Sequence, residues 1–414
     1  MTEREWKRLD VVRRVDGGKL TVEEAGRVLG LSARQLRRLR KRVRAQGTDG
    51  VVHGNTGRPP VNRLSDTLRA RVVRLAREKY VGFNDHQLTE KLLEVELLTL
   101  SRPSVQRILR GAGVRAVRQR RPPKHRRRRD RRPQAGMMIL WDGSRHDWLE
   151  GRGPMLCLVG AIDDATGELL PGAHFVEQEC AQGYLRVLEA IAREKGLPLS
   201  AYMDRHGALK RNDDHWSLEE QLRGEQDPTQ VGRALAALGI EAIFALSPQA
   251  KGRVERLWGT LQDRLTSELR LAKAATCAAA NAVLERYRAD HNRRFALAPR
   301  DATPAWRPVG RRDLRRLCSF CYAATVLNDN TVRLEGVIID IPPGPRGRSY
   351  AQARVEVRQY LDGSWGVYGG DSDKPIATAA ATELGELRVR RRRKRSATTK
   401  AFGRAIEQVA ACLP

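Results

Sequence analysis

The first fifty residues place apolar side chains at helical spacing among many polar ones. A capping box begins at Thr21, where side chains satisfy unpaired amides at a helix start, and Gly30 would end that helix. Ser32 can cap a second, arginine-rich helix. Its inner-face residues are Leu36, Leu39 and Val43. This order is that of a helix-turn-helix, although a helical hairpin with a solvated basic face fits the spacing equally well.

A second helical block follows a break at NTGRPP, where glycine and two prolines cannot continue a helix. Ser65 opens one amphipathic helix, and a middle helix is predicted over about 85–96. A third begins near Ser101, with Pro103 in its first turn. The block is a second candidate helix-turn-helix.

The pattern then changes to that of β-strands. An apolar run ends at Asp142, and two further strands form a hairpin around the turn at 164–167. An amphipathic helix at 182–195 precedes a fourth strand, which ends at Asp204. A polar insertion, a fifth strand and a long helix follow. Three antiparallel strands, a helix, a strand, a helix and a strand are the order of an RNase H-like α/β fold.

Residues 319–370 are rich in Thr, Val and Tyr, with turns at LNDN and LDGS, and predict a small β-barrel. The predicted fold class is therefore multidomain, with N-terminal all-α helix-turn-helix domains, a central α/β RNase H-like core and a C-terminal small β-barrel. The predicted segments are 1–53 (helix-turn-helix), 54–64 (linker), 65–114 (second helical domain), 115–134 (basic linker), 135–306 (α/β core), 315–385 (β-barrel) and 386–414 (basic tail).

Charge indicates the kind of partner. The chain carries 77 Lys and Arg against 49 Asp and Glu, a formal net charge of +28. Nucleic acid is the natural partner for such an excess. An anionic membrane is the rival, but it requires an anchoring segment, and no run of about 18 apolar residues occurs.

The N-terminus lacks the apolar stretch of a signal peptide, and the six cysteines show no disulfide-like rhythm. Cys318 and Cys321 form a single CxxC, which is better explained by structural thiols than by zinc. A cytoplasmic, nucleoid-associated protein with reduced cysteines is expected.

Basic residues gather in four places: the second helix, the linker after the helical blocks, the start of the long helix and the C-terminal tail. Each phosphate that they neutralise releases counterions, which gives affinity for DNA without sequence readout. The residues predicted to bind DNA are Arg34, Arg37, Arg38, Lys41, Arg44, Arg126, Arg127, Arg128, Arg129, Lys251, Arg253, Arg391, Arg392 and Arg393.

Three acids occupy positions suited to a shared site. Asp142 and Asp204 each follow a predicted strand, and functional groups in open α/β sheets gather around strand ends. Glu255 lies on the polar side of the long helix, opposite a Leu/Trp stripe at helical spacing. That stripe comprises Val254, Leu257, Trp258, Leu261 and Leu265.

Clustered carboxylates are hard oxygen ligands that suit Mg²⁺ or Mn²⁺. Two such ions, roughly 3.5–4 Å apart, can activate an attacking oxygen and stabilise the leaving one in phosphoryl transfer. Taken singly, each acid is more simply explained as an ordinary surface residue, since the chain holds 49 acidic residues.

Three stretches carry a family resemblance: WDGSRHDWLEGRGP at 141–154, MDRHG at 203–207 and SPQAKGRVERLWGTLQDRL at 247–265. They resemble the catalytic motifs of ISNCY-type insertion-sequence transposases, within the DDE transposase and retroviral integrase superfamily. The resemblance implies that Asp142, Asp204 and Glu255 are the catalytic acids, which hold two divalent ions. His146 and His206, within the same motifs, are candidate auxiliary residues.

The resemblance also implies a function. Such a chain binds the terminal inverted repeats of its element, nicks the 3′ ends by hydrolysis and joins the 3′-OH to target DNA. Its partner is double-stranded DNA, and joining two ends implies a homodimer or larger assembly. A catalytically inactive DNA-binding regulator and an RNase H-like metal-dependent nuclease are the alternatives.

Overall fold

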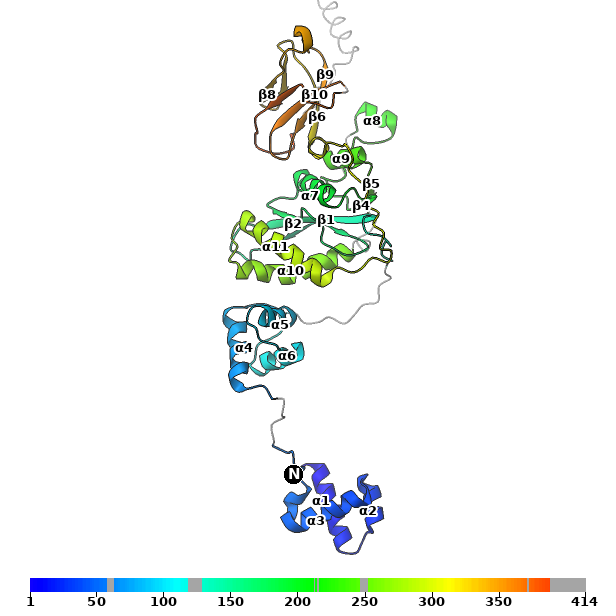
Figure 1. Ribbon diagram of the computed structural model, residues 1–414, viewed down its shortest axis with the longest axis vertical. Helices are drawn as coiled ribbons and strands as arrows, with labels where there is room; N and C mark the ends of the chain where they lie inside the picture. The colour runs from blue at the N-terminus through cyan, green and yellow to red at the C-terminus, as the bar shows by residue number, and fades with distance from the viewer. Residues whose placement is uncertain are drawn as a thin grey trace, which may run out of the picture. The chain divides into compact units, whose positions relative to one another are not determined.

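The computed structural model describes residues 1–57, 63–117, 129–211, 213, 216–245, 252–370 and 372–387. The chain divides into two compact units, Met1–Arg71 and Val72–Pro414. Each unit has its own helices or sheets (Figure 1).

The N-terminal unit contains three capped helices. They are α1 (Glu3–Asp16), α2 (Val22–Leu29) and α3 (Ala33–Gln46), followed by the short 3₁₀ helix η1 (Gly47–Val51). Thr21 and Ser32 cap α2 and α3, as predicted, and left-handed Gly30 ends α2. The capping box predicted at Thr21 is present, and Ser32 forms one as well. Leu36 and Leu39 are buried among apolar residues of α1 and α2. The two predicted helices are confirmed, and α1 adds a third.

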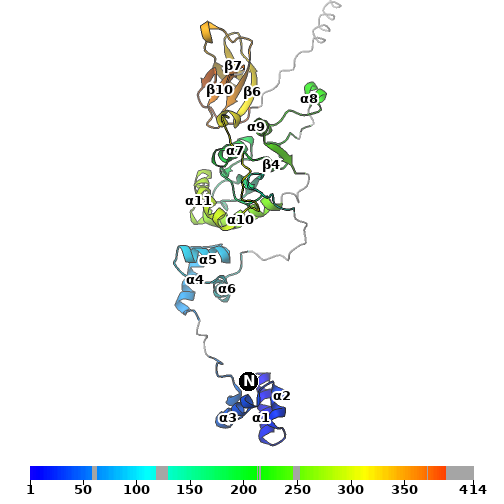
Figure 2. The same cartoon turned by 45° about the vertical axis from the view of Figure 1, so that its right-hand side comes forward.

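Three further helices follow. They are α4 (Asp66–Glu78), α5 (Asp85–Glu94) and α6 (Arg102–Gly111) (Figure 2). Ser101 caps α6, with proline in its first turn, as the sequence predicts. The buried face of α5 carries Leu88 and Leu92. This helix contacts the long helix α10 (Gly252–Leu271): the Lys91 ammonium lies 2.9 Å from the Glu268 carboxylate.

The core is a five-stranded mixed sheet with the order β3-β2-β1-β4-β5. The strands are β1 (Met138–His146), β2 (Leu156–Asp163), β3 (His174–Val176), β4 (Ser200–Met203) and β5 (Glu241–Phe244). β1 pairs antiparallel with β2 and parallel with β4. This is the predicted order, in which antiparallel strands are followed by parallel ones.

Helices cover both faces of the sheet, because successive side chains of a strand point to opposite faces. Ile139 and Trp141 are buried with α7 (Ala181–Glu194) and α9 (Gln230–Leu238). Met138 and Leu140 are buried with α10 and α11 (Cys277–Phe295). Figure 1 shows α7 and α10 on opposite sides of the sheet.

Strand β1 does not end at Asp142, which corrects the sequence prediction. It pairs with β2 as far as His146, opposite Leu156, whereas its parallel pairing with β4 stops at Leu140, opposite Tyr202. Asp142 therefore lies inside a strand but beyond the end of the parallel ladder. Asp204 directly follows β4, as predicted.

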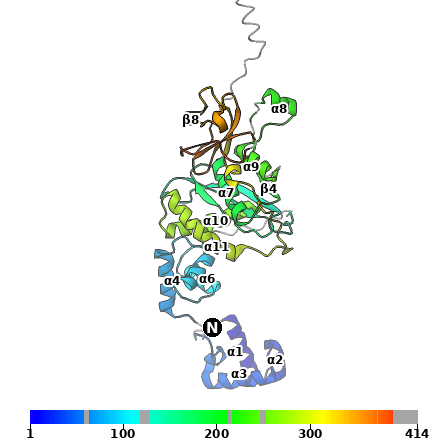
Figure 3. The ribbon, with the colours of Figure 1, turned by 45° about the horizontal axis from the view of Figure 1, so that its top comes forward.

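The polar insertion after β4 contains a short helix, α8 (Leu218–Arg223), which the sequence did not predict. Ser217 and Glu220 form its capping box, and the Glu220 carboxylate accepts a hydrogen bond from Arg211 at 2.5 Å. The helix is drawn clear of the core sheet in every view (Figure 3). These contacts lie within the insertion and gather its described residues around Glu220.

The C-terminal strands form two sheets. They comprise β6 (Phe320–Thr325), β7 (Thr331–Leu334), β8 (Val337–Asp340), β9 (Arg354–Gln359), β10 (Trp365–Gly369) and β11 (Ala377–Ala379), with α12 (Leu314–Leu317) before them and η3 (Pro345–Gly347) between β8 and β9. The orders are β11-β10-β9-β6 and β7-β8, and Val332 and Val357 are buried in one shared core. The predicted strands are confirmed. Closure into a barrel is not confirmed, because in the described part of the chain β7 and β8 hydrogen-bond as a separate pair.

Among the described helices, none combines the length and the apolar character needed to cross a membrane. Cys318 is buried in the C-terminal core, and burial raises the pKa of its thiol to about 12. This environment suits a structural thiol.

Buried His291 on α11 makes folding stability depend on pH. Burial, together with the nearby positive charge of Arg264, lowers the pKa of this imidazole from 6.5 to about 4. The unfolded chain therefore binds a proton at a higher pH than the folded chain does. We expect stability to be full above pH 6.5 and to fall by roughly 3 kcal/mol as the pH approaches 4.

Urea unfolding at several pH values tests this expectation. His291→Gln should remove most of the loss of folding stability between pH 6.5 and 4. His53→Gln, at an exposed histidine, should leave that loss unchanged. An unaltered pH dependence in His291→Gln would show that another group is responsible.

Candidate active site

Asp142 and Asp204 occupy matching positions on neighbouring strands. The parallel register pairs Met138 with Ser200 and Leu140 with Tyr202, and the same offset places Asp142 level with Asp204. Both residues lie two positions beyond the last paired residues, Leu140 and Tyr202, at the same end of the two strands. Both side chains are half-buried.

Helix α10 fixes the first acid. The indole Nε1 of buried Trp258 donates a hydrogen bond to Asp142 Oδ2 at 3.1 Å. One turn further along α10, the Gln262 amide donates to Ser144 Oγ at 3.2 Å. The helix thus runs beside β1 with its Leu/Trp stripe against the sheet, as predicted. The contact between Trp258 and Asp142 was not predicted, since the sequence indicated only a packing role for this tryptophan.

Glu255 lies in the first turn of α10, one turn before Trp258, and is exposed. Within the described ranges, no three His, Cys, Asp or Glu side chains lie close enough together to hold a metal ion. The strand register places Asp142 and Asp204 at matching positions, and Glu255 lies on the helix that contacts Asp142 without completing a triad. Its catalytic role stays a prediction.

The two candidate histidines lie in different surroundings. The backbone amide of His206 donates to Asp204 Oδ1 at 2.9 Å, so the turn after β4 holds that carboxylate. Its ring Nδ1 lies 3.5 Å from the Glu179 carboxylate. His146 ends β1, and its ring meets the edge of Trp148 at 5.4 Å between centroids.

Glu179 is a third acid near the pair, and no sequence motif marks it. It lies just before α7, and Tyr184 donates a hydrogen bond to it at 2.5 Å. Burial and then the nearby charges of Glu179, Asp142 and Asp204 raise the pKa of the Tyr184 phenol well above 10. Tyr184 therefore remains protonated and serves as a hydrogen-bond donor.

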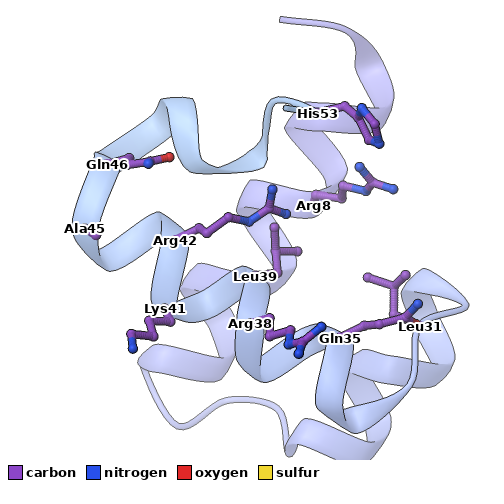
Figure 4. Close-up of a pocket in the computed structure, with 10 residues that line it drawn as sticks. All are labelled: Arg8, Leu31, Gln35, Arg38, Leu39, Lys41, Arg42, Ala45, Gln46 and His53. Carbon is purple, nitrogen blue, oxygen red and sulfur yellow. The ribbon is translucent and has the colours of Figure 1, made fainter. Parts of the chain in front are cut away.

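The N-terminal unit carries a separate basic surface. All five predicted DNA-binding residues of α3 are exposed, although Arg44 lies 2.8 Å from Asp16 of α1. A hollow of about 640 Å³ adjoins them. Its basic and imidazole side chains are Arg8, Arg38, Lys41, Arg42 and His53. Figure 4 shows Arg8 and Arg42 extending toward the same space, where they would favour an anion such as a phosphate.

Comparison with known proteins gives one domain match and two long relatives. Residues 7–60 match the family described as "Helix-turn-helix domain". The "Putative transposase y4bF" of Sinorhizobium fredii is 39% identical over 309 residues, covering 75% of this chain and 66% of that protein. The "Transposase for insertion sequence IS1202" of Streptococcus pneumoniae is 32% identical over 329 residues, covering 70% of this chain and 68% of that protein. The chain belongs to the insertion-sequence transposases.

The chain thus spans about two thirds of the length of both relatives. Among solved structures, the HTLV-2 integrase catalytic core domain in complex with magnesium is 18% identical. The match covers 36% of this transposase and 85% of that chain, with a TM-score of 0.25. A TM-score this low supports no argument about fold or function.

Two predicted DNA-binding residues of the transposase form ion pairs within the protein. Arg129 lies 2.6 Å from the carboxylate of Asp164, a fully buried residue, and Arg253 pairs with the same carboxylate. Burial of Asp164 opposes ionisation, but hydrogen bonds from Arg129 and the Arg132 amide outweigh it, and the pKa is lowered from 3.8. The sequence indicated only a turn at Asp164. Its structural role is to join the start of α10 to residues before β1.

The remaining predicted DNA-binding residues lie outside the described residues. They are Arg126, Arg127, Arg128, Lys251, Arg391, Arg392 and Arg393. Their roles in this transposase stay predictions based on charge.

Proposed function

We propose that this chain is a DDE-type transposase that cuts its own element from flanking DNA at the 3′ ends and joins those ends to target DNA. Water attacks the phosphorus at each end, the bond to the 3′ oxygen breaks, and that oxygen takes a proton. The new 3′-OH then attacks a target phosphodiester and displaces another 3′ oxygen. The observation that supports the proposal most is the registered pair Asp142 and Asp204, with Trp258 bound to Asp142.

The carboxylates fit a divalent cation in their chemistry, because Mg²⁺ and Mn²⁺ prefer hard oxygen ligands. Asp142, Asp204 and Glu255 would hold the ions, and two ions are expected. When bound, they would activate the attacking oxygen and stabilise the leaving one.

The chain's own residues position these acids. Trp258 restrains the Asp142 carboxylate, and the His206 amide restrains that of Asp204. Such partners fix the orientation of a ligand before substrate arrives. His146 and His206 are proposed as auxiliary residues that contact DNA or the leaving group.

Helix α3 is proposed to recognise the terminal inverted repeats, and the basic linker and tail to hold the phosphate backbone. The exposed arginines of α3 and the neighbouring basic hollow support this assignment. Joining two ends to one target requires both ends in one complex, so a homodimer or larger assembly on DNA is proposed.

The proposal is tested by incubating the full chain with labelled element ends, Mg²⁺ and a target plasmid. Labelled ends covalently joined to the plasmid are expected. Nicking without joining would indicate an RNase H-like nuclease instead, and binding without chemistry would indicate an inactive regulator.

Salt should weaken binding to element ends steeply. A protein that contacts about 6–10 phosphates loses roughly 10³–10⁵-fold in DNA affinity when the salt concentration rises from 50 to 200 mM. Removing two arginines of α3 with Arg34→Ala and Arg37→Ala should lower the slope of log K against log salt by about 2, if each contacts a phosphate. Fluorescence anisotropy with labelled end DNA measures both effects.

The matched control is Arg4→Ala, at an exposed arginine of α1. It should leave the slope nearly unchanged. A flat salt response of the unmodified chain, or equal slopes for the control and the double variant, would contradict the role assigned to α3.

A further inference from the structure

The carboxylate of Glu179 contacts side chains from three parts of the core. Tyr184 of α7 donates to Oε1 at 2.5 Å, and the Cys157 thiol of β2 lies 3.7 Å from Oε2. The His206 ring, after β4, lies 3.5 Å from Oε1. Glu179 is 22% exposed, so these partners enclose most of the side chain.

A fourth contact is with the backbone of β1. A Cβ added to Gly143 would lie 2.5 Å from both the Cδ and the Oε2 atoms of Glu179. An alanine at this position would have to displace the flexible end of the Glu179 side chain. The carboxylate thus packs directly against the residue that follows Asp142.

Glu179 therefore touches a neighbour of each aspartate. Gly143 adjoins Asp142, and His206 donates its backbone amide to Asp204. Because side chains alternate along β1, Gly143 faces the side opposite to Asp142, which bonds Trp258 of α10. Glu179 reaches the pair from the α7 side, where it contacts the β1 backbone at Gly143 and the His206 ring after β4.

We propose that Glu179 is a positioning residue that sets the spacing of Asp142 and Asp204 from the opposite face of the sheet. The proposal rests on the proposed function, since the spacing matters through the cation that the two acids hold. Tyr184 restrains Glu179 in turn. Groups that bond a metal ligand directly change metal affinity or activity by about 10–100-fold when they are altered, and Glu179 acts one residue further from the ion.

The test measures Mn²⁺ affinity of the full chain by the electron paramagnetic resonance signal of free Mn²⁺, together with strand joining. Glu179→Gln and Tyr184→Phe should weaken Mn²⁺ binding by about 10-fold, the lower end of that range, and raise the Mn²⁺ concentration for half-maximal joining in parallel. Glu177→Gln, at an exposed acid two residues away, is the control and should change neither.

Gly143→Ala supplies an independent variant, because it displaces the Glu179 carboxylate without removing it. It should weaken Mn²⁺ binding as Glu179→Gln does. Adding Glu179→Ala removes the clash, so the double variant should bind Mn²⁺ no more weakly than Glu179→Ala alone. If the losses of Mn²⁺ affinity from Gly143→Ala and Glu179→Ala add in the double variant, the two residues do not act through the same contact.

Two results would overturn the proposal. Unchanged Mn²⁺ affinity in Glu179→Gln would show that the carboxylate does not position the acids. Loss of one Mn²⁺ per chain, rather than weaker binding, would make Glu179 a ligand instead. Failure of the unmodified chain to join DNA would refute the proposed function, but the Mn²⁺ affinities would still decide the role of Glu179.

Discussion

Asp142→Asn should reduce strand joining by about 10³-fold or more while leaving end binding intact. The substitution removes one negative charge from the pair that would hold the cation, and metal stabilisation of phosphoryl transfer is worth several kcal/mol. The amide oxygen of asparagine can still accept the hydrogen bond from Trp258, so α10 should stay in place. The yield of labelled ends joined to plasmid measures the effect.

Trp258→Phe is a useful comparison because it keeps the charge of Asp142 and removes only the indole donor. It should cost far less activity than Asp142→Asn. Joining at the unmodified rate by Asp142→Asn would refute the assignment of the catalytic acids.

Asp164→Asn should destabilise the core and misplace the start of α10. This carboxylate is fully buried between Arg129 and Arg253, and removal of one partner of a buried ion pair costs about 3–5 kcal/mol. We expect about 3 kcal/mol, because Arg129 is 48% exposed and solvent screens part of its charge. Joining should also fall, since Arg253 lies two residues before Glu255.

Urea unfolding measures the stability of this variant, with Asp130→Asn as an exposed control. The lowered pKa of Asp164 means that its stabilisation is fully present above pH 3.8 and is lost as the pH falls below that value. Asp164→Asn should therefore lose less stability than the unmodified chain below pH 3.8. Equal unfolding midpoints for the variant and the unmodified chain at neutral pH would contradict the role given to this residue.

Locally encoded features were predictable from the sequence. The capping residues Thr21 and Ser32 begin α2 and α3 as expected, because a capping box involves neighbours in the chain. The apolar stripe of α10 is buried as expected for the same reason, since helical periodicity is also local.

Features that depend on distant pairing were not predictable. β1 passes Asp142 because it pairs with β2 up to His146, and apolar patterning does not report that pairing. The C-terminal strands were predicted from the sequence, but whether they close into a barrel depends on pairing between segments far apart in the chain. Glu179 and Asp164 carried no motif, and their importance comes from spatial contacts alone.

The central claim is that Asp142 and Asp204, completed by Glu255, hold a divalent cation. The most direct measurement replaces Mg²⁺ by Fe²⁺ with ascorbate and peroxide, so that hydroxyl radicals cut the polypeptide near the bound ion. We predict fragments that end near residues 142, 204 and 255, which Mg²⁺ suppresses by competition and which disappear in Asp142→Asn. Cutting elsewhere, or the same fragments in Asp142→Asn, would contradict the claim.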